Sequence, residues 1–320
     1  MPRSDEKSTV VVLPDAERVA TEEAIPAFVN PNAKNADAAS SVLAEAGRFA
    51  IEHVAPRQLA EKVRQAIRAG ARRVLVAGGD GSIGSAANVL CGEQCELAIL
   101  PAGTLNHLSQ DLGLPDDLTE AAKIAAGVHT RLIDVAEVNG RVFLNTSSVG
   151  AYVTFVRTRE RLEPRLGYWL SSAIAALRIL RRLRSFRVTL EVEGVEREYV
   201  TPLVFIGVAE RELRLPKLGA RVSGGRSGLH VMVVRSRSGA RVVALALAAA
   251  ARGLRAVSAT PAMDSFIVDK LRVEPRTPRV GDCIALDGET AGMEPPLRYR
   301  LRRGALRVVV PDANLKERED

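Results

Sequence analysis

Strand-like and helix-like segments alternate through residues 24–100, and this alternation restricts the fold of the chain more than any other feature. The apolar, strand-like runs are Ile25–Val29, Phe49–Val54, Val74–Ala77 and Leu97–Leu100. The helix-like stretches between them lie near residues 36–46, 57–69 and 82–90. Such an alternation predicts a parallel sheet whose strands are joined by right-handed helical crossovers.

The pattern changes past about residue 135, where short segments with a strand-like alternation follow one another. These segments are Val188–Val192, Tyr199–Val208, Leu229–Val234, Phe266–Val273, Cys283–Leu286 and Leu306–Val310. They predict a mostly antiparallel β region. Two helices are expected within it, over Leu166–Arg184 and Ala240–Val257, and the first is both amphipathic and basic.

A chain of 320 residues is roughly twice the commonest domain length, so we expect two domains. The expected division is an extension over residues 1–23, an α/β domain over 24–135, a mostly antiparallel β domain over 136–311 and a tail over 312–320. The longest unbroken apolar run, Val242–Ala251, has about half the length that a membrane-spanning helix needs. Because no secretory signal is recognisable either, we expect a cytoplasmic protein.

The formal net charge of +7 favours an anionic partner. Aromatic residues make up only 4% of the chain and are not interleaved with basic residues as a base-stacking surface requires, which argues against nucleic acid. Arginines gather between Arg157 and Arg187, where they could bind an anionic membrane surface or form a solvated helix face. An exposed edge strand could pair two copies of the chain into a homodimer.

The strongest local motif is Gly78-Gly79-Asp80-Gly81-Ser82, which directly follows one strand-like run and precedes a helix-like stretch. Glycines let the backbone approach a phosphate closely, and a helix N-terminus directs N–H groups and a positive dipole end at the anion. Asp80 would be repelled by phosphates unless a cation such as Mg²⁺ lies between them or the carboxylate orients a hydroxyl nucleophile. The structural alternative is a glycine turn with a capping Asp or Ser.

Two further loops follow strands of the expected sheet. Pro101–Asn106 follows the fourth strand, and Asn30–Asn35 leaves the first strand, so that Asn30 and Lys34 could contact a nucleotide. Adjacent strand ends form the crevice in which ligands bind to open α/β sheets. Far downstream, Asp287-Gly288-Glu289 brings two carboxylates close together, which fits either a general base or an ordinary turn.

Together these motifs resemble, in order and spacing, the bacterial diacylglycerol kinase and lipid kinase family, which is related to sphingosine and ceramide kinases and more distantly to NAD kinases. The segments that carry the resemblance are Asn30-Pro31, Gly78–Ser82, Pro101–Asn106, Arg131–Asp134, Phe143–Asn145 with Gly150, and Asp287–Glu289. The resemblance implies an N-terminal, NAD-kinase-like α/β domain that binds a nucleotide and a C-terminal β-sandwich domain, with ATP bound between them.

The resemblance also implies a role for each matching residue. The residues implied to bind ATP are Asn30, Pro31, Lys34, Gly78, Gly79, Asp80, Gly81, Ser82, Gly84, Gly103, Thr104 and Asn106. Asp80 would organise Mg²⁺ and the phosphates, and Glu289, with Asp287 as its neighbour or substitute, would accept the proton of a lipid hydroxyl. The implied reaction is an in-line phosphoryl transfer that converts diacylglycerol to phosphatidic acid, by a protein that visits the inner face of the membrane.

Several positions depart from the family pattern. Lys34 and Ala36 stand where the first loop usually carries glycine, and Gly207–Ala209 replaces a more polar segment. Ser223 and Gly228 stand where relatives place acidic residues around a structural Mg²⁺, so we expect that second metal site to be absent.

Two other functions remain open from the sequence. A soluble, NAD-kinase-like enzyme would share the Gly-Gly-Asp-Gly loop, although Pro101–Asn106 and Asp287–Glu289 argue against it. A pseudokinase that binds nucleotide and membrane without turnover would explain the lost acidic residues.

Overall fold

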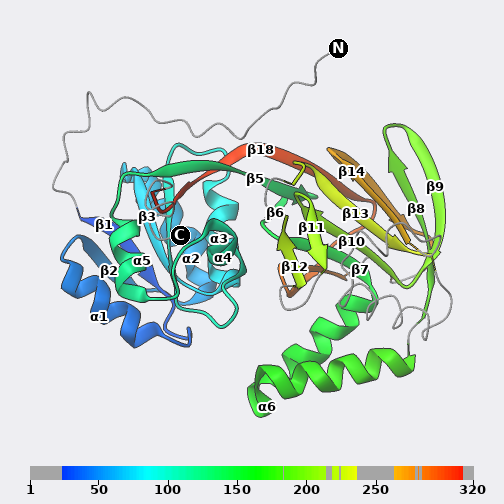
Figure 1. Ribbon diagram of the computed structural model, residues 1–320, viewed down its shortest axis with the longest axis horizontal. Coiled ribbons are helices and arrows are strands. Elements are labelled where there is room, and N and C mark those ends of the chain that lie inside the picture. Colours follow the sequence, from blue (N-terminus) through cyan, green and yellow to red (C-terminus); the bar gives the residue numbers. More distant parts are fainter. Residues whose placement is uncertain are drawn as a thin grey trace, which may run out of the picture. The chain divides into compact units, whose positions relative to one another are not determined.

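The computed structural model describes residues 24–182, 184–213, 218–222, 225–235, 263–277, 280 and 283–312. The expected extension over residues 1–23, the expected helix over Ala240–Val257, Ser223 and the tail beyond Asp312 lie outside the described residues. The chain divides into two compact units, Met1–Ile133 with Gly304–Asp320 and Asp134–Arg303 (Figure 1). One unit is an α/β structure and the other is mostly antiparallel β, so the expected α/β, two-domain fold class is confirmed.

The first unit is built on a parallel sheet, as the alternating pattern predicts. Its strands are β1 (Ile25–Val29), β2 (Phe49–His53), β3 (Arg73–Gly78) and β4 (Glu96–Pro101). Its helices are α1 (Ala36–Ala46), α2 (Pro56–Arg68), α3 (Asp80–Leu90), α4 (His107–Leu112) and α5 (Leu118–Ala125). The parallel pairings give the order β2-β1-β3-β4, and the last two strands are buried along nearly their whole length, which is typical of a parallel sheet packed on both faces.

Local sequence signals explain where the helices of this unit begin and end. Pro56 occupies the first turn of α2, where its missing N–H costs no hydrogen bond. Leu59 and Val63, one turn apart, form the buried face of the same helix. Gly47, in the left-handed region at φ 64°, terminates α1.

Two strands pass from one unit to the other. They are β5 (Thr130–Val138) and β18 (Leu297–Val309). In the second unit Leu297 and its neighbours pair antiparallel with β15, and near the end of the same strand Val308 pairs parallel with Leu97 of β4. The last part of β18 therefore adds a strand to the sheet of the first unit.

The second unit contains antiparallel strands in two larger sheets and one small sheet. Besides parts of β5 and β18, the strands are β6 (Arg141–Phe143), β7 (Thr146–Gly150), β8 (Phe186–Val192), β9 (Val195–Thr201), β10 (Leu203–Val208), β11 (Arg211–Leu213), β12 (Leu218–Arg221), β13 (Leu229–Val234), β14 (Met263–Val268), β15 (Lys270–Pro275), β16 (Cys283–Leu286) and β17 (Glu289–Gly292). One sheet has the order β14-β13-β10-β7-β16-β17, and the other places β18, β15, β8 and β9 side by side. Strands β11 and β12 pair with each other in the small sheet.

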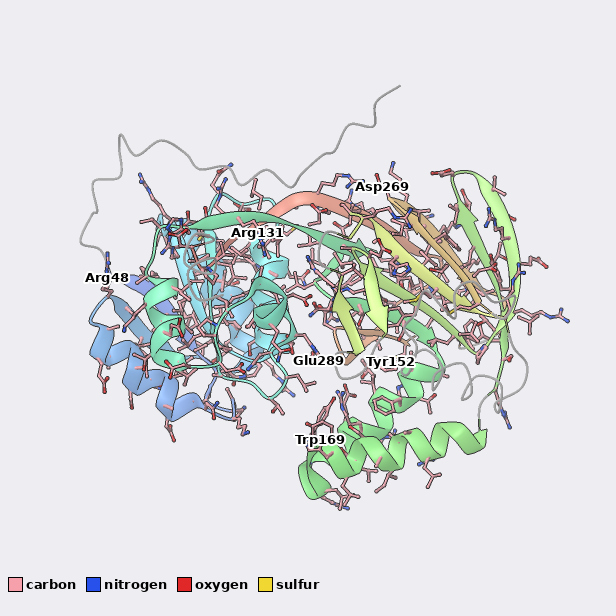
Figure 2. The ribbon with its side chains drawn as sticks, in the orientation of Figure 1. Arg48, Arg131, Tyr152, Trp169, Asp269 and Glu289 are labelled. Atoms are coloured by element: carbon pink, nitrogen blue, oxygen red, sulfur yellow. The ribbon has the colours of Figure 1, made fainter. Side chains whose placement is uncertain are left out.

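Helix α6 (Ala151–Arg182) is two helices joined at a break. Gly167 has non-helical dihedral angles of φ 72° and ψ 170°, and Pro164 precedes it. Figure 2 shows Tyr152 on the first segment and Trp169 on the second. The expected helix over Leu166–Arg184 corresponds to the second segment, whereas no helix was expected over residues 151–165. Within the described chain, no helix is long and apolar enough to cross a membrane.

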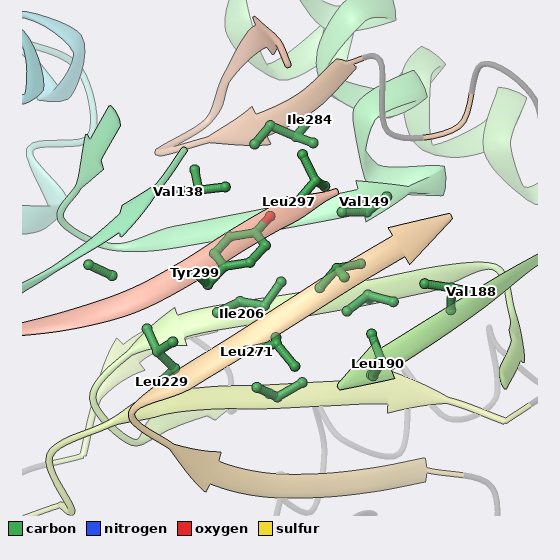
Figure 3. Close-up of a cluster of buried hydrophobic side chains, with 14 of the residues drawn as sticks. Val138, Val149, Val188, Leu190, Ile206, Leu229, Leu271, Ile284, Leu297 and Tyr299 are labelled. Atoms are coloured by element: carbon green, nitrogen blue, oxygen red, sulfur yellow. The ribbon is translucent and has the colours of Figure 1, made fainter. Parts of the chain in front are cut away.

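A large hydrophobic core lies between the two larger sheets of the second unit (Figure 3). Val149, Ile206 and Ile284 project from one sheet, and Leu190 and Leu271 project from the other. The ring of Tyr299 is buried with them and meets Phe143 edge to face, and its hydroxyl group bonds to Ser147 at 3.0 Å. This packing explains the alternation of apolar and polar residues that the sequence shows in this region.

Two apolar runs that the sequence analysis treated as single strands are each divided. The run Tyr199–Val208 breaks at Pro202, which has no N–H to donate to a neighbouring strand. The Oγ1 atom of Thr201 donates to the carbonyl oxygen of Leu203 and accepts the N–H of Leu203, which closes the turn. The run Phe266–Val273 breaks at Asp269, between β14 and β15.

Candidate functional site

Two glycine loops of the first unit lie against each other because the strands before them pair in register. Gly78, at the end of β3, pairs with Pro101, at the end of β4, and the N–H of Ala102 donates to the carbonyl oxygen of Gly78 at 3.2 Å. A Cβ atom on Gly103 would overlap the Cα atom of Gly79. The absence of a side chain at Gly103 is therefore what allows the two backbones to approach.

The loop after β1 joins the same group. The Nδ2 atom of Asn30 donates to the Oγ atom of Ser82 at 3.0 Å, and the N–H of Asn35 donates to the carbonyl oxygen of Ala102 at 3.1 Å. Ser82 is buried in the first turn of α3. The structure thus brings the three loops of the expected nucleotide site together at one edge of the sheet.

Asp80 links the first glycine loop to α4. Its two carboxylate oxygens accept the N–H groups of His107, at 3.2 Å, and Leu108, at 3.3 Å. An acidic group at the N-terminus of a helix satisfies N–H groups that have no partner inside the helix. Asp80 therefore has a structural role, which the sequence analysis considered only as a capping alternative within its own turn.

Asn106 shapes the second glycine loop from inside. It adopts a left-handed conformation at φ 49°, and its Oδ1 atom accepts the N–H of Gly103 at 3.1 Å. Its Nδ2 atom donates to the carbonyl oxygens of Pro101 and Gly103, both at 3.3 Å. The buried Asn106 side chain thus forms hydrogen bonds that hold the conformation of its own loop.

The remaining residues of the expected nucleotide site lie at the surface of these loops. Pro31, Lys34 and Thr104 are exposed, and Gly81 and Gly84 are half-buried in the first turns of α3.

Asp80 was also expected to hold Mg²⁺. Throughout the part of the chain that the structure describes, no group of three or more His, Cys, Asp or Glu side chains is arranged to hold a metal ion. Asp80 is a single carboxylate, and each oxygen that accepts one N–H keeps a further lone pair. Such a donor set fits Mg²⁺ that is bound mainly by phosphate oxygens and water, with one carboxylate from the protein.

In the second unit, Asp287 and Gly288 form the two-residue turn between β16 and β17. Both residues have positive φ angles, 46° and 86°, which is the geometry that Asp-Gly favours in a tight hairpin. The Asp287 carboxylate accepts three backbone N–H groups, from Leu144 at 2.8 Å, Asn145 at 2.7 Å and Thr146 at 2.9 Å. These three bonds hold the Asp287 carboxylate against the backbone of Leu144–Thr146, so the geometry favours a positioning role for Asp287.

Glu289 follows this turn and is in a different environment (Figure 2). Part of its side chain is open to solvent, yet the surrounding protein withdraws the carboxyl group from water, and this desolvation raises its pKa. The negative charge of Glu160 raises the pKa further, while Arg141 and Arg159 lower it. A carboxyl group with a raised pKa is a better proton acceptor than an ordinary glutamate.

Helix α6 holds the hairpin on both sides of Glu289. The carboxylate of Glu160 accepts the N–H of Thr290 at 3.1 Å and its hydroxyl group at 3.0 Å. Arg159 donates to the carbonyl oxygen of Gly288 at 2.7 Å. Neither residue could be assigned to this hairpin from the sequence, because no helix was expected over residues 151–165 and an adjacent Arg-Glu pair in a basic segment carries no distinguishing signal.

Gly207 and Gly228, two of the positions that depart from the family pattern, are tightly packed. A Cβ atom on Gly207 would lie 2.5 Å from Cγ of Arg211, a buried residue whose guanidinium group donates to the carbonyl oxygen of Val208. Gly228 has φ 148° and lies against Ile267. Glycine at these positions makes room for neighbouring side chains.

Comparisons with known proteins show what the chain is similar to. Residues 26–138 match the family model of the diacylglycerol kinase catalytic domain. The protein named "Probable lipid kinase YegS-like" from Pseudomonas fluorescens (strain Pf0-1) is 29% identical over 261 residues, 78% of this chain and 79% of that protein. The crystal structure of a diacylglycerol kinase from Bacillus anthracis str. Sterne shares the fold, with a TM-score of 0.66 and 21% identity over 91% of this chain and 98% of that one. Residues 26–138 are therefore similar to diacylglycerol kinase catalytic domains, and most of the chain is similar to proteins named as probable lipid kinases.

Proposed function

We propose that the protein is a lipid kinase that transfers the γ-phosphoryl group of ATP, with Mg²⁺, to the hydroxyl group of a lipid, and that diacylglycerol is its substrate and phosphatidic acid its product. The observation that carries the proposal is the match of residues 26–138 to the diacylglycerol kinase catalytic domain. The names of the relatives support the lipid as acceptor.

The glycine loops supply the features that a triphosphate needs. Gly78, Gly79 and Gly103 let the backbone lie close to the ligand, and the first turn of α3 presents N–H groups and the positive end of a helix dipole. Lys34 and Thr104 are exposed beside these loops and add a cation and a hydroxyl donor. When bound, Mg²⁺ neutralises phosphate charge, and Asp80 is the residue that would contribute to holding it.

Glu289 supplies the base in this proposal. Its carboxylate accepts the proton of the lipid hydroxyl, the hydroxyl oxygen forms a bond to the γ-phosphorus, and the bond from that phosphorus to the leaving ADP oxygen breaks. Asp287 and Glu160 keep the hairpin in place through their hydrogen bonds to Leu144–Thr146 and to Thr290.

The proposal is tested by transfer of labelled γ-phosphate from ATP with Mg²⁺ to diacylglycerol and other hydroxyl lipids in anionic mixed micelles, with NAD⁺ as a parallel acceptor. We expect label in a lipid-soluble phosphate ester. Label in NADP⁺ would instead identify an NAD-kinase-like enzyme. Nucleotide binding without any transfer would identify a pseudokinase.

The Glu289→Gln variant is expected to lower turnover about 10²- to 10⁴-fold, the usual range for loss of a general base. Glu196→Gln, at an exposed position on β9, is the matched control and should leave turnover unchanged. Wild-type turnover in Glu289→Gln would remove Glu289 from the mechanism.

A further inference from the structure

The second segment of α6 presents its apolar residues outward. Trp169 is 80% exposed, and Leu170 and Leu177 are about half exposed, whereas Ser171 and Ala175 on the opposite side are fully buried. A helix that packs on a soluble protein normally shows the reverse pattern, with its large apolar residues facing the core. We call the exposed residues Leu166, Trp169, Leu170, Ile174 and Leu177 the apolar ridge.

Contacts of Tyr168 with Trp169 and with Arg159 support the apolar ridge. The ring of Trp169 meets the ring of Tyr168 edge to face, with centroids 5.5 Å apart. Arg159, on the first segment of α6, lies over the Tyr168 ring at 5.3 Å and also forms an ion pair with Glu163. The side of the helix that carries the small residues Ser171 and Ala175 packs within the protein, so the apolar ridge on the other side can contact a partner.

The charge of α6 indicates the chemistry of that partner. The helix carries seven arginines and two glutamates and has no lysine or aspartate. Arg165 and Arg178, at the two ends of the ridge, are exposed. A second copy of the chain docked on this surface would bring like charges together, whereas anionic lipid headgroups would complement them.

We propose that the apolar ridge inserts into an anionic lipid bilayer, with the second segment of α6 lying in the plane of the headgroups. Leucine side chains would enter the edge of the acyl region, Trp169 would sit at the interface that tryptophan prefers, and the flanking arginines would contact lipid phosphates. The proposal rests on the proposed function only in that a lipid kinase must reach a bilayer. Insertion itself requires no catalysis.

Trp169 provides a direct test, because it is the only tryptophan in the chain. The emission of the wild-type protein is measured on addition of phosphatidylglycerol vesicles and, separately, phosphatidylcholine vesicles. With the anionic vesicles we expect a blue shift, and quenching when the acyl chains carry bromine. The same shift is expected for Glu289→Gln, and this result would show that membrane binding by the apolar ridge does not depend on catalysis.

Variants that retain Trp169 as the fluorescent reporter test the contribution of the other residues of the apolar ridge. Leu170→Ser with Leu177→Ser should weaken binding to anionic vesicles at least about tenfold, because less apolar area is buried. Leu132→Ser with Val195→Ser, which changes two exposed apolar residues elsewhere, is the matched control and should bind like the wild type. Replacing Arg165 or Arg178 by Gln should weaken binding about fivefold each at low salt.

Three outcomes would overturn the proposal. They are the absence of vesicle binding, vesicle binding that leaves Trp169 emission unchanged, and a wild-type dimer that the Leu170/Leu177 variant dissociates. A blue shift in a protein that phosphorylates no lipid would instead overturn the proposed function and leave the membrane surface in place.

Discussion

At the scale of single residues, the carboxylates of the candidate site differ in what they bind. Two of them accept backbone N–H groups and hold the fold, and the third is the proposed base. Asp80 and Asp287 both receive backbone N–H groups from distant parts of the chain. Glu289, two residues after Asp287, has a raised pKa instead. Two acidic residues that look equivalent in the sequence are therefore expected to have different roles.

This difference predicts opposite consequences for two amide substitutions. Asp287→Asn should lower the free energy of unfolding by about 2–3 kcal/mol, because an amide cannot accept all three N–H groups. Asn tolerates the left-handed conformation at this position, so backbone strain is not added. Glu289→Gln should unfold like the wild type in urea. Equal stability of both variants would contradict the positioning role of Asp287.

Glu160 and Arg159 are expected to shift the pH dependence of turnover in opposite directions. Removing the negative charge in Glu160→Gln lowers the pKa of Glu289, so the deprotonated base persists to lower pH. The acidic limb of the pH profile of kcat/KM therefore shifts to lower pH. Removing the positive charge in Arg159→Met raises the pKa of Glu289 and shifts the acidic limb to higher pH.

The pH–rate profiles of the two variants are compared at low and high ionic strength. Both shifts should shrink as salt screens the charges. Shifts in the same direction would indicate that the two residues act only by holding the hairpin.

At the scale of elements, strand ends and helix starts create the nucleotide loops. The parallel register of β3 and β4 brings Gly79 and Gly103 together, and Asp80 ties α3 to the start of α4. The sequence predicted these loops well, since a buried strand followed by glycine is a local pattern. It predicted α6 poorly, because Gly167 and Pro164 interrupt the helical periodicity of that segment.

The contact between the loops predicts the effect of Gly103→Ala. A Cβ atom there would overlap the Cα atom of Gly79 and lie 2.7 Å from Oδ1 of Asn106. We expect a loss of about 1–3 kcal/mol in unfolding free energy and loss of nucleotide binding. Gly79→Ala meets only one atom, at 3.3 Å, and should destabilise less. Full nucleotide affinity in Gly103→Ala would show that the loops need not touch.

At the scale of the whole molecule, each unit has its own hydrophobic core. The expected nucleotide loops all belong to the first unit, and the Glu289 hairpin belongs to the second. Strands β5 and β18 supply residues to both units.

This division predicts that nucleotide binding and the proposed base can be separated in one experiment. A non-hydrolysable ATP analogue with Mg²⁺ at 100 times its Kd should stabilise the protein by about 2.7 kcal/mol, measured as a rise in Tm. Glu289→Gln should show the same rise while lacking turnover. Loss of the rise in that variant would place Glu289 in nucleotide binding.

The parallel sheet of the first unit, the antiparallel character of the second, and the glycine turns at the ends of β3 and β4 could all be predicted from the sequence alone. These features depend on neighbours along the chain, such as apolar runs and residues that permit tight turns. Three other features depend on tertiary packing: Asp287 binds the Leu144–Thr146 backbone, Glu160 bonds to Thr290, and α6 directs Trp169 outward. The hydrogen-bonded partners lie more than a hundred residues apart, and the face that a helix buries depends on what packs against it, so no local pattern contains these outcomes.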